Sequence, residues 1–135
     1  MVVVSVNKER LRKFTGVDIE EIKNIVEMLG GEVKREDEEN LDFELYPDRP
    51  DLYSIFGLSR AIRQYVYREK RSYRVYGSNV TVFVDEKLKN IRPYIGCAII
   101  KNINLDDETI RDIMDMQEKL HLSVGRKSDN PNVAW

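Results

Sequence analysis

The stretch Pro47-Asp48-Arg49-Pro50-Asp51-Leu52-Tyr53-Ser54-Ile55 decides how the first half of this chain folds. Each of its two prolines is followed by an aspartate, and one arginine stands between the two pairs. Proline fixes its own φ and disfavours helical geometry in the residue before it, so a rigid elbow is expected. Prolines and acids are common at helix N-termini, so the stretch alone indicates a helix start and nothing more specific. The helix should begin near Asp51 or Ser54, since an apolar stripe at helical spacing follows: Leu52, Ile55, Phe56, Ile62 and Val66.

Upstream of the elbow, helix and strand signals alternate. Residues 2–6 are typical of a short strand, and Asn7 is placed to cap a brief helix that ends before Gly16. A second helix is expected from a capping-box-like start at Asp18 to the Gly30-Gly31 pair. Residues 32–35 suit a strand, and residues 41–45 alternate apolar with polar, as in a strand that is wet on one face.

Beyond Gly77-Ser78-Asn79, the best candidate linker, the pattern changes. Residues 80–84 and 95–100 are almost uniformly apolar, which favours strands buried on both faces, with Cys97 as a small core residue. Between them residues 86–91 suggest a helical turn, and residues 73–76 just before the linker suggest one more strand. A last helix is expected to start at an acidic cluster near residue 106 and to end at Gly125, with this stripe: Ile110, Ile113, Met114, Gln117, Leu120 and Val124.

The chain ends on the apolar triplet Val133-Ala134-Trp135, which is typical of the first residues of a buried strand. Two strands and one helix are few elements to close a core. The sequence therefore predicts an α+β fold, with a small helix-plus-strand domain over residues 1–77. Residues 78–135 are expected to be the opening strands and helix of a second, incomplete α/β domain, so the chain is expected to be a piece of a longer protein.

Composition bounds the functional classes. Of 135 residues, 34% are charged and 41% hydrophobic, with a formal net charge of -2, which favours a soluble globular domain over a polybasic nucleic-acid arm. No apolar run is long enough to span a bilayer, and neither a secretory signal nor a disulfide framework is indicated, which favours a cytoplasmic location.

The residue inventory argues against several chemistries. One cysteine and one histidine, Cys97 and His121, cannot build a structural zinc site, and the acidic residues 36–39 lack the spacing of a calcium loop and suit a solvated turn. His121 is expected at a helix end, partly exposed, without a nucleophile motif to accompany it. Neither a phosphate-binding glycine loop nor a dinucleotide fingerprint is present.

One basic cluster could carry binding. Residues 60–74 hold six cations against Glu69 alone, about +5 in a slightly acidic chain, and Tyr65, Tyr67 and Tyr73 interleave with them. Cations neutralise phosphates and tyrosines stack on unpaired bases, so the cluster suits RNA. A solvated helix face followed by a polar loop explains it equally well. The candidate RNA-contact residues are Arg60, Arg63, Arg68, Lys70, Arg71 and Arg74.

The stretch from Asp48 to Ser54, followed by Gly57-Leu58-Ser59-Arg60-Ala61-Ile62, resembles the N-terminal part of the phenylalanyl-tRNA synthetase β subunit. That family carries an Asn/Asp-Arg-Pro-Asp-Leu-x-Ser motif that runs into Gly-(Ile/Leu/Val)-(Ala/Ser)-Arg. Collinear segments of the second half are similar to its archaeal and eukaryotic form: residues 78–88, Ile91-Arg92-Pro93-Tyr94, Gln117-Glu118-Lys119-Leu120 and Gly125-Arg126-Lys127.

The resemblance implies a non-catalytic N-terminal portion of an ATP-dependent ligase that serves protein biosynthesis. In that family the aminoacylation site lies on an α subunit, the enzyme is an (αβ)₂ heterotetramer acting on tRNA(Phe), and ATP and magnesium serve the whole ligase. No cofactor, metal or catalytic residue for aminoacylation is therefore expected in this segment, which alone should be inactive. Residues 78–135 would begin the domain that hydrolyses mischarged tyrosyl-tRNA(Phe).

Carried over by motif, the editing-cleft candidates are Gln117, Glu118, Arg126 and Lys127, and the structural family motif is Asp48, Arg49, Pro50 and Asp51. From its place on the apolar stripe, Gln117 is either a buried, satisfied core amide or a cleft residue, whereas Glu118 should face solvent. The sequence departs from the family at residues 128–132, where further arginines are usual. Two alternatives stay open: a free-standing RNA- or tRNA-binding module, and a structural domain whose basic helix pairs with an acidic partner.

Overall fold

The computed structural model describes residues 1–70, 72–91 and 93–123, which divide into two compact units. Unit 1 comprises Met1–Lys70 together with the chain from Asp106 onward, and unit 2 is Arg71–Leu105.

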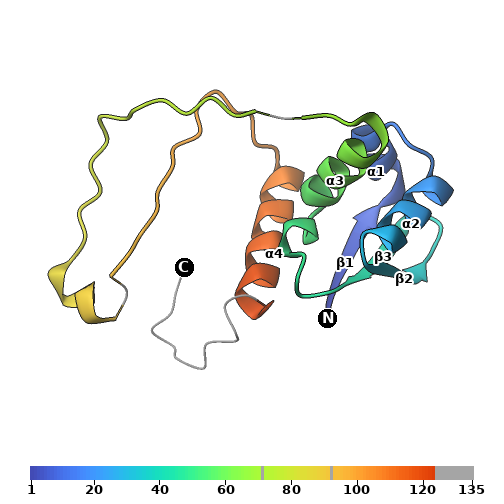
Figure 1. The fold of residues 1–135 in the computed structure, drawn as a ribbon, viewed down its shortest axis with the longest axis horizontal. Helices are drawn as coiled ribbons and strands as arrows, with labels where there is room; N and C mark the ends of the chain where they lie inside the picture. Colours follow the sequence, from blue (N-terminus) through green and yellow to red (C-terminus); the bar gives the residue numbers. More distant parts are fainter. Residues whose placement is uncertain (71, 92, 124–135) are drawn as a thin grey trace. The chain divides into compact units, whose positions relative to one another are not determined.

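Unit 1 contains an antiparallel sheet of three strands: β1 (Val2–Asn7), β2 (Gly31–Glu36) and β3 (Asn40–Leu45). Their order is β1-β3-β2, so β3 is central and its Phe43 lies opposite Val4 on one side and Val33 on the other (Figure 1). The register of β2 shifts between Val33 and Arg35. These strands confirm the α+β fold class.

Apolar and polar residues alternate along β3, and the structure places them on opposite faces of the sheet, as the sequence predicted. Leu41, Phe43 and Leu45 are buried on the core face, whereas Asp42 and Glu44 lie on the other face and are partly exposed. Successive side chains of a strand point to opposite faces, so one face of the sheet packs against helices and the other stays in contact with solvent.

The first two helices form where their sequence signals predicted them, but one of the two expected N-terminal caps does not form. The side chain of Asn7 accepts a hydrogen bond from the backbone N–H of Arg10 at 3.1 Å, and α1 (Lys8–Thr15) ends at Gly16, whose φ is 71°. The second helix, α2 (Ile19–Met28), starts after Asp18, but the expected capping box does not form. The Asp18 carboxylate makes no cap hydrogen bond in the described chain and instead lies 3.4 Å from Arg12.

The proline elbow forms as a 3-10 turn, η1 (Pro50–Leu52), that leads into α3 (Ile55–Tyr67). Ser54 caps α3 by accepting a hydrogen bond from the backbone N–H of Gly57 at 3.1 Å. A Cβ on Gly57 would lie 1.9 Å from the backbone oxygen of Asp51. Elbow and helix are therefore in backbone contact, which only glycine permits at this position.

The core of unit 1 is a single cluster in which helices and sheet meet. Its largest fully buried side chains are Tyr53 and Phe43, and the elbow contributes both Tyr53 and Leu52. The remaining buried apolar members are Val4, Val6, Leu11, Val17, Ile22, Ile25, Val26, Leu41, Leu45, Ile55, Leu58, Ala61 and Ile62. The stretch from Pro47 to Ile55 thus contributes Leu52, Tyr53 and Ile55 to the core.

Unit 2 contradicts four expectations: three strands and a buried cysteine. Residues 73–76, 80–84 and 95–100 form no strand in the described chain, and Cys97 is exposed instead of buried. Apolar side chains there are open to solvent, with Phe83 93% and Ile100 73% exposed. A strand buried on both faces needs neighbouring strands and covering layers, and the described residues supply neither. The expected helical turn is confirmed as η2 (Glu86–Asn90).

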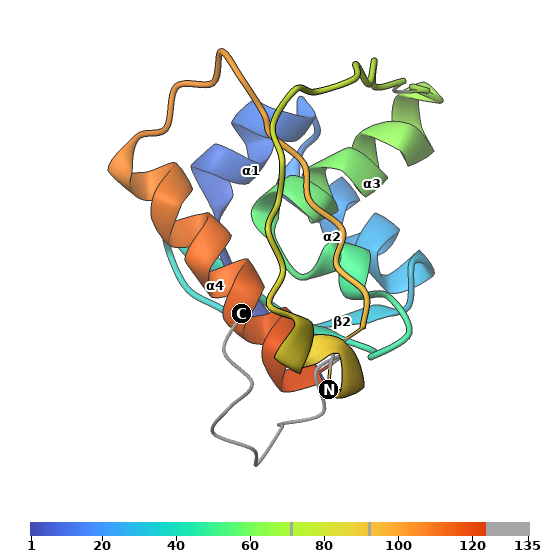
Figure 2. The same cartoon turned by 90° about the vertical axis from the view of Figure 1, so that its left-hand side faces the viewer.

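The last helix is confirmed as α4 (Asp107–Ser123), but its expected stripe is not the buried face. Ile110, Ile113 and Met114 are exposed, and only Leu120 of the stripe packs on the core within the described residues. The helix lies on the outside of unit 1 next to α1 (Figure 2). Residues 124–135, including Val124, Gly125 and the apolar end with Trp135, lie outside the described residues.

Ion pairs of Arg10 link α1 to α4. Arg10 lies 3.1 Å from Glu108 and 2.7 Å from Asp112, and its guanidinium stacks over the ring of Phe14. Because α4 belongs to unit 1, the two contact units do not follow the predicted boundary at residues 77/78, which stays a prediction. In the described chain, the helices are too short or too polar to cross a membrane.

Candidate functional site

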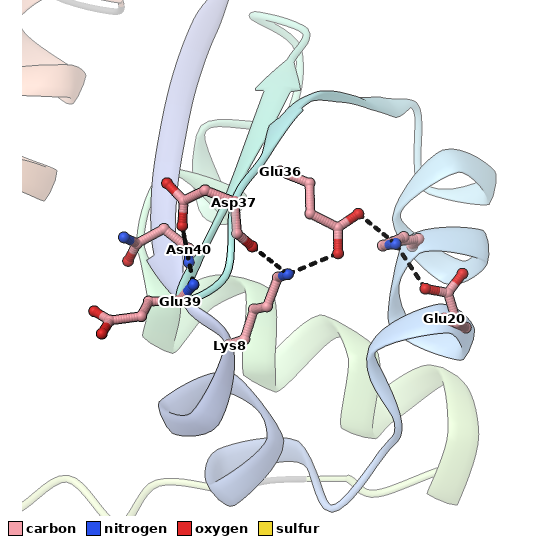
Figure 3. Close-up of polar contacts among 7 residues, drawn as sticks. Lys8, Glu20, Glu36, Asp37, Glu39 and Asn40 are labelled. Atoms are coloured by element: carbon pink, nitrogen blue, oxygen red, sulfur yellow. Dashed lines mark hydrogen bonds and ion pairs between the residues drawn. The ribbon is translucent and has the colours of Figure 1, made fainter.

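A charged network joins α1, α2 and the end of β2 (Figure 3). The Nζ of Lys8 lies 2.7 Å from one oxygen of Glu36, and the Nζ of Lys23 lies 2.6 Å from the other. Lys23 also reaches Glu20 at 2.7 Å. Hydrogen bonds from Lys23 and Lys8 lower the pKa of Glu36. These charges pair with one another across three elements, so the network serves the fold.

The acidic residues 36–39 form the turn that the sequence predicted. The Asp37 carboxylate accepts hydrogen bonds from the backbone N–H groups of Asn40 and Glu39 at 2.7 and 3.0 Å, which lowers its pKa (Figure 3). The described residues contain no group of three or more histidines, cysteines or acids that could hold a metal ion.

Arg63, one of the predicted RNA-contact residues, fastens α3 to the end of α1. Its Nε donates to Glu69 at 3.0 Å, and its Nη2 pairs with the other oxygen of that carboxylate, which raises the pKa of Arg63. Its Nη1 donates to the backbone oxygens of Phe14 and Thr15, both at 3.4 Å. The guanidinium also stacks over Tyr67, 5.3 Å from the ring centroid.

Tyr67 completes this attachment. Its hydroxyl donates to the backbone oxygen of Gly16 at 3.1 Å. The last carbonyls of a helix have no partner within it, so Arg63 and Tyr67 act as a cap supplied by α3 to α1. We call the contacts of Arg63 and Tyr67 with residues 14–16, together with the Arg63–Glu69 pair, the clasp.

The family motif also pairs its charges internally. Arg49 donates through Nε and Nη2 to the two oxygens of Asp51 at 2.9 and 3.0 Å, a bidentate pair that raises the pKa of Arg49 and lowers that of Asp51. Arg60 is half-buried, and its charge adds to the lowering of the Asp51 pKa. Pro50 opens the 3-10 turn and Asp48 is exposed beside it. The motif therefore builds the elbow.

Three of the six predicted RNA-contact residues remain exposed and free of ion pairs in the described chain: Arg68, Lys70 and Arg74. Arg71 lies outside the described residues. Arg68 follows α3 directly and has a φ of 55°, a left-handed conformation usually left to glycine. Of the other two, Arg63 is bound within the clasp and Arg60 is half-buried, and the RNA contact of the six residues stays a prediction.

Two exposed cations near the clasp were missed at the sequence level. Arg12 and Lys13 lie in the last turn of α1 and line a shallow depression of about 450 Å³ together with Glu9, Gly16, Val17 and Asp18. Basic residues at a helix C-terminus are ordinary in sequence, so the only available signal was their place just before Gly16.

The editing-cleft candidates are not brought together by the described residues. Gln117 and Glu118 are both exposed on α4, so Gln117 is not the buried core amide that was one of its alternatives. Arg126 and Lys127 lie outside the described residues. His121 is half-buried near the end of α4, as expected. The editing role of these residues stays a prediction.

Comparison with solved structures finds the same fold in a synthetase fragment. The structure matches a crystal structure of an N-terminal fragment of the phenylalanyl-tRNA synthetase β subunit from Pyrococcus horikoshii, with a TM-score of 0.80 and 35% identity. The match covers 93% of this chain and 39% of that one. The fold is thus that of an aminoacyl-tRNA synthetase subunit fragment. No family model matches the sequence.

Comparison with curated proteins identifies individual relatives of this chain. The phenylalanine–tRNA ligase β subunits of Methanocorpusculum labreanum and Methanococcoides burtonii are 45% and 41% identical to this chain, each over 128 residues. Both alignments cover 93% of this chain but 24% of the relative, so the chain spans about a quarter of their length. The chain is homologous to the N-terminal region of phenylalanine–tRNA ligase β subunits, mostly archaeal ones, and the resemblance read from the sequence is confirmed.

Proposed function

We propose that this chain is the N-terminal, non-catalytic portion of a phenylalanine–tRNA ligase β subunit and supports formation of phenylalanyl-tRNA as a scaffold within the enzyme. The observation that carries the proposal is the similarity to such subunits over 93% of the chain. The Asp48–Asp51 motif adds support, because it builds the elbow whose Leu52 and Tyr53 fill the core.

The complete ligase would be an (αβ)₂ heterotetramer in the cytoplasm that uses ATP and magnesium to charge tRNA(Phe). Residues 78–135 would open its editing domain, to which Gln117, Glu118, Arg126 and Lys127 would contribute. The exposed apolar side chains of residues 80–84 and 95–100 support this role, because a longer chain such as that of the relatives would supply the covering layers.

A chimera tests the proposal. The matching N-terminal region of the Methanocorpusculum labreanum β subunit is replaced by this chain and co-expressed with the α subunit of that organism. We expect the chimera to co-purify with the α subunit and to form phenylalanyl-tRNA, whereas the same host β subunit without its N-terminal region should lose assembly or activity. A soluble chimera that leaves the α subunit unbound would contradict the proposal.

The isolated chain provides a second measurement. We expect no phenylalanine-dependent pyrophosphate exchange from it, because aminoacylation in this family resides on the α subunit. Exchange activity without an α subunit would show that the assignment as a non-catalytic portion is wrong.

A free-standing RNA-binding module is the second candidate function. Exposed cations next to the clasp favour it, since they would serve RNA binding with or without a ligase around them.

A further inference from the structure

We propose that the C-terminal ends of α1 and α3 form one surface that binds the phosphate backbone of a structured RNA. We call it the basic rim and define it by Arg12, Lys13, Arg68 and Lys70. The inference rests on the proposed function, in which the natural RNA is a tRNA, and it says which part of unit 1 meets that RNA.

The clasp brings the two ends together. The hydroxyl of Tyr67, the last residue of α3, lies 3.1 Å from the backbone oxygen of Gly16, the residue that ends α1. Arg12 and Lys13 occupy the turn just before Gly16, and Arg68 follows Tyr67 directly. The ends of α1 and α3, more than fifty residues apart in sequence, are therefore joined, and Figure 1 shows the two helices ending side by side.

The rim side chains are available to a ligand. All four are exposed, and Lys13, Arg68 and Lys70 take part in no ion pair within the described chain. Arg12 lies 3.4 Å from Asp18, but the two side chains are 61% and 84% exposed, so a phosphate can compete for the guanidinium. The nearby Glu69 is already bound by Arg63, and the acids beside Arg12 and Lys13 are Glu9 and Asp18, which line the same depression.

A helix C-terminus normally repels anions, and the clasp removes that obstacle. The partial negative charge of a helix C-terminus resides on its unpaired carbonyls. Here the carbonyls of residues 14–16 accept hydrogen bonds from Arg63 and Tyr67. An approaching phosphate would therefore meet guanidinium and ammonium groups, whose charge and geometry suit phosphate oxygens.

The backbone of Arg68 provides an independent argument. Its φ of 55° is costly for a residue with a Cβ, and glycine would adopt it without strain. Unfavourable backbone conformations held by the surrounding structure are found preferentially at functional sites. The side chain of Arg68 is exposed and forms no ion pair within the described chain, so it is accessible to a phosphate.

The test measures binding of the full 135-residue chain to a fluorescein-labelled tRNA(Phe) transcript by anisotropy at several salt concentrations. The rim variant is Lys13→Gln/Arg68→Gly/Lys70→Gln. The control, Arg35→Gln/Lys101→Gln/Arg111→Gln, removes the same charge from exposed positions elsewhere. Each lost phosphate contact lowers the slope of log K against log salt by about 0.7–0.9, so the rim variant should lose about 2 from its slope. We expect at least tenfold weaker binding for the rim variant and less than twofold change for the control.

Three results would overturn the inference: no binding of the transcript by the natural chain, equal slopes for the rim variant and the natural chain, or an equal loss in the control. Poly-L-glutamate serves as a second ligand in the same assay. If the chain binds poly-L-glutamate as tightly as tRNA, the partner of the rim is an acidic protein and the inference is wrong. The chimera assay does not depend on this titration, so failure of the rim leaves the proposed function standing.

The single variant Arg68→Gly separates binding from stability. Glycine relieves the left-handed backbone, so the urea midpoint should stay equal or rise while tRNA binding weakens severalfold. A purely structural role for Arg68 predicts instead that stability and binding fall together, and that result would also overturn the inference.

Discussion

Substituting Gly57 tests whether the elbow and α3 form one rigid piece. A Cβ at residue 57 would lie 1.9 Å from the backbone oxygen and 3.0 Å from the backbone carbon of Asp51, and real Cβ atoms stay beyond about 3.0 Å. The elbow would have to retreat by about 1 Å. The clashing atoms are backbone, so no side chain can rotate away, and the buried Leu52 and Tyr53 would move with the elbow.

The magnitude follows from three terms. Overpacking against backbone costs about 3 kcal/mol, at the upper end of its usual range. Disturbing the Ser54 cap adds about 1 kcal/mol, and replacing glycine by alanine inside a helix returns about 1 kcal/mol. We therefore expect Gly57→Ala to lower the free energy of unfolding by about 3 kcal/mol, and the Tm of unit 1 by at least about 10 °C.

Urea denaturation followed by far-UV circular dichroism measures this effect, with two glycine controls. Gly77→Ala should change stability by less than about 0.5 kcal/mol, because nothing lies within 4 Å of its Cβ position. Gly31→Ala should fall between the two, since its Cβ would meet methyl groups of Val26 and Leu45 that can shift. If Gly57→Ala is as stable as Gly77→Ala, the account of the elbow is refuted.

Three further predictions concern charges and the thiol. Arg10→Ala should speed hydrogen exchange in α4 while exchange in α1–α3 stays slow, because Arg10 bridges to Asp112; Arg111→Ala, an exposed change on α4 itself, should leave exchange unaltered. The pKa of Glu36 is lowered in the folded state, so its charge stabilises the fold above the unfolded pKa of about 4.5, and this stabilisation is lost as the pH falls below that value. The urea midpoint of Glu36→Gln should therefore depend less on pH in that range than the midpoint of the natural chain. Cys97 is exposed and should react fully with Ellman's reagent in the folded chain, whereas a slow, unfolding-limited reaction would place the thiol in a core.

Local signals in the sequence predicted most of unit 1. The cap at Asn7, the stop at Gly16, the alternation over residues 41–45 and the Ser54 helix start each depend on residues close in sequence, and the structure confirms all of them. The Asp18 cap failed because its carboxylate faces a competing cation, Arg12.

Features that depend on residues far apart in the chain could not be predicted from the sequence. The spacing of Arg63 on α3 marks it as a surface cation, yet the carbonyls it binds lie 48 and 49 residues earlier. An apolar run such as residues 80–84 indicates that its side chains are to be buried, but the pattern does not identify the element that covers them. For the same reason the stripe on α4 was assigned to a core that the described residues do not build.

The register of the sheet has a consequence for biosynthesis. Val2 pairs with Leu45 and Asn7 with Asn40, so β1 leaves the ribosome well before its neighbour β3 and stays unpaired until residues 40–45 have emerged. The buried Tyr53, Leu58 and Ile62 come later still, so the apolar interior closes only once α3 is translated. Nascent chains arrested before that point should be sensitive to protease along their whole length, and those arrested well beyond it should protect the first seventy residues as one block.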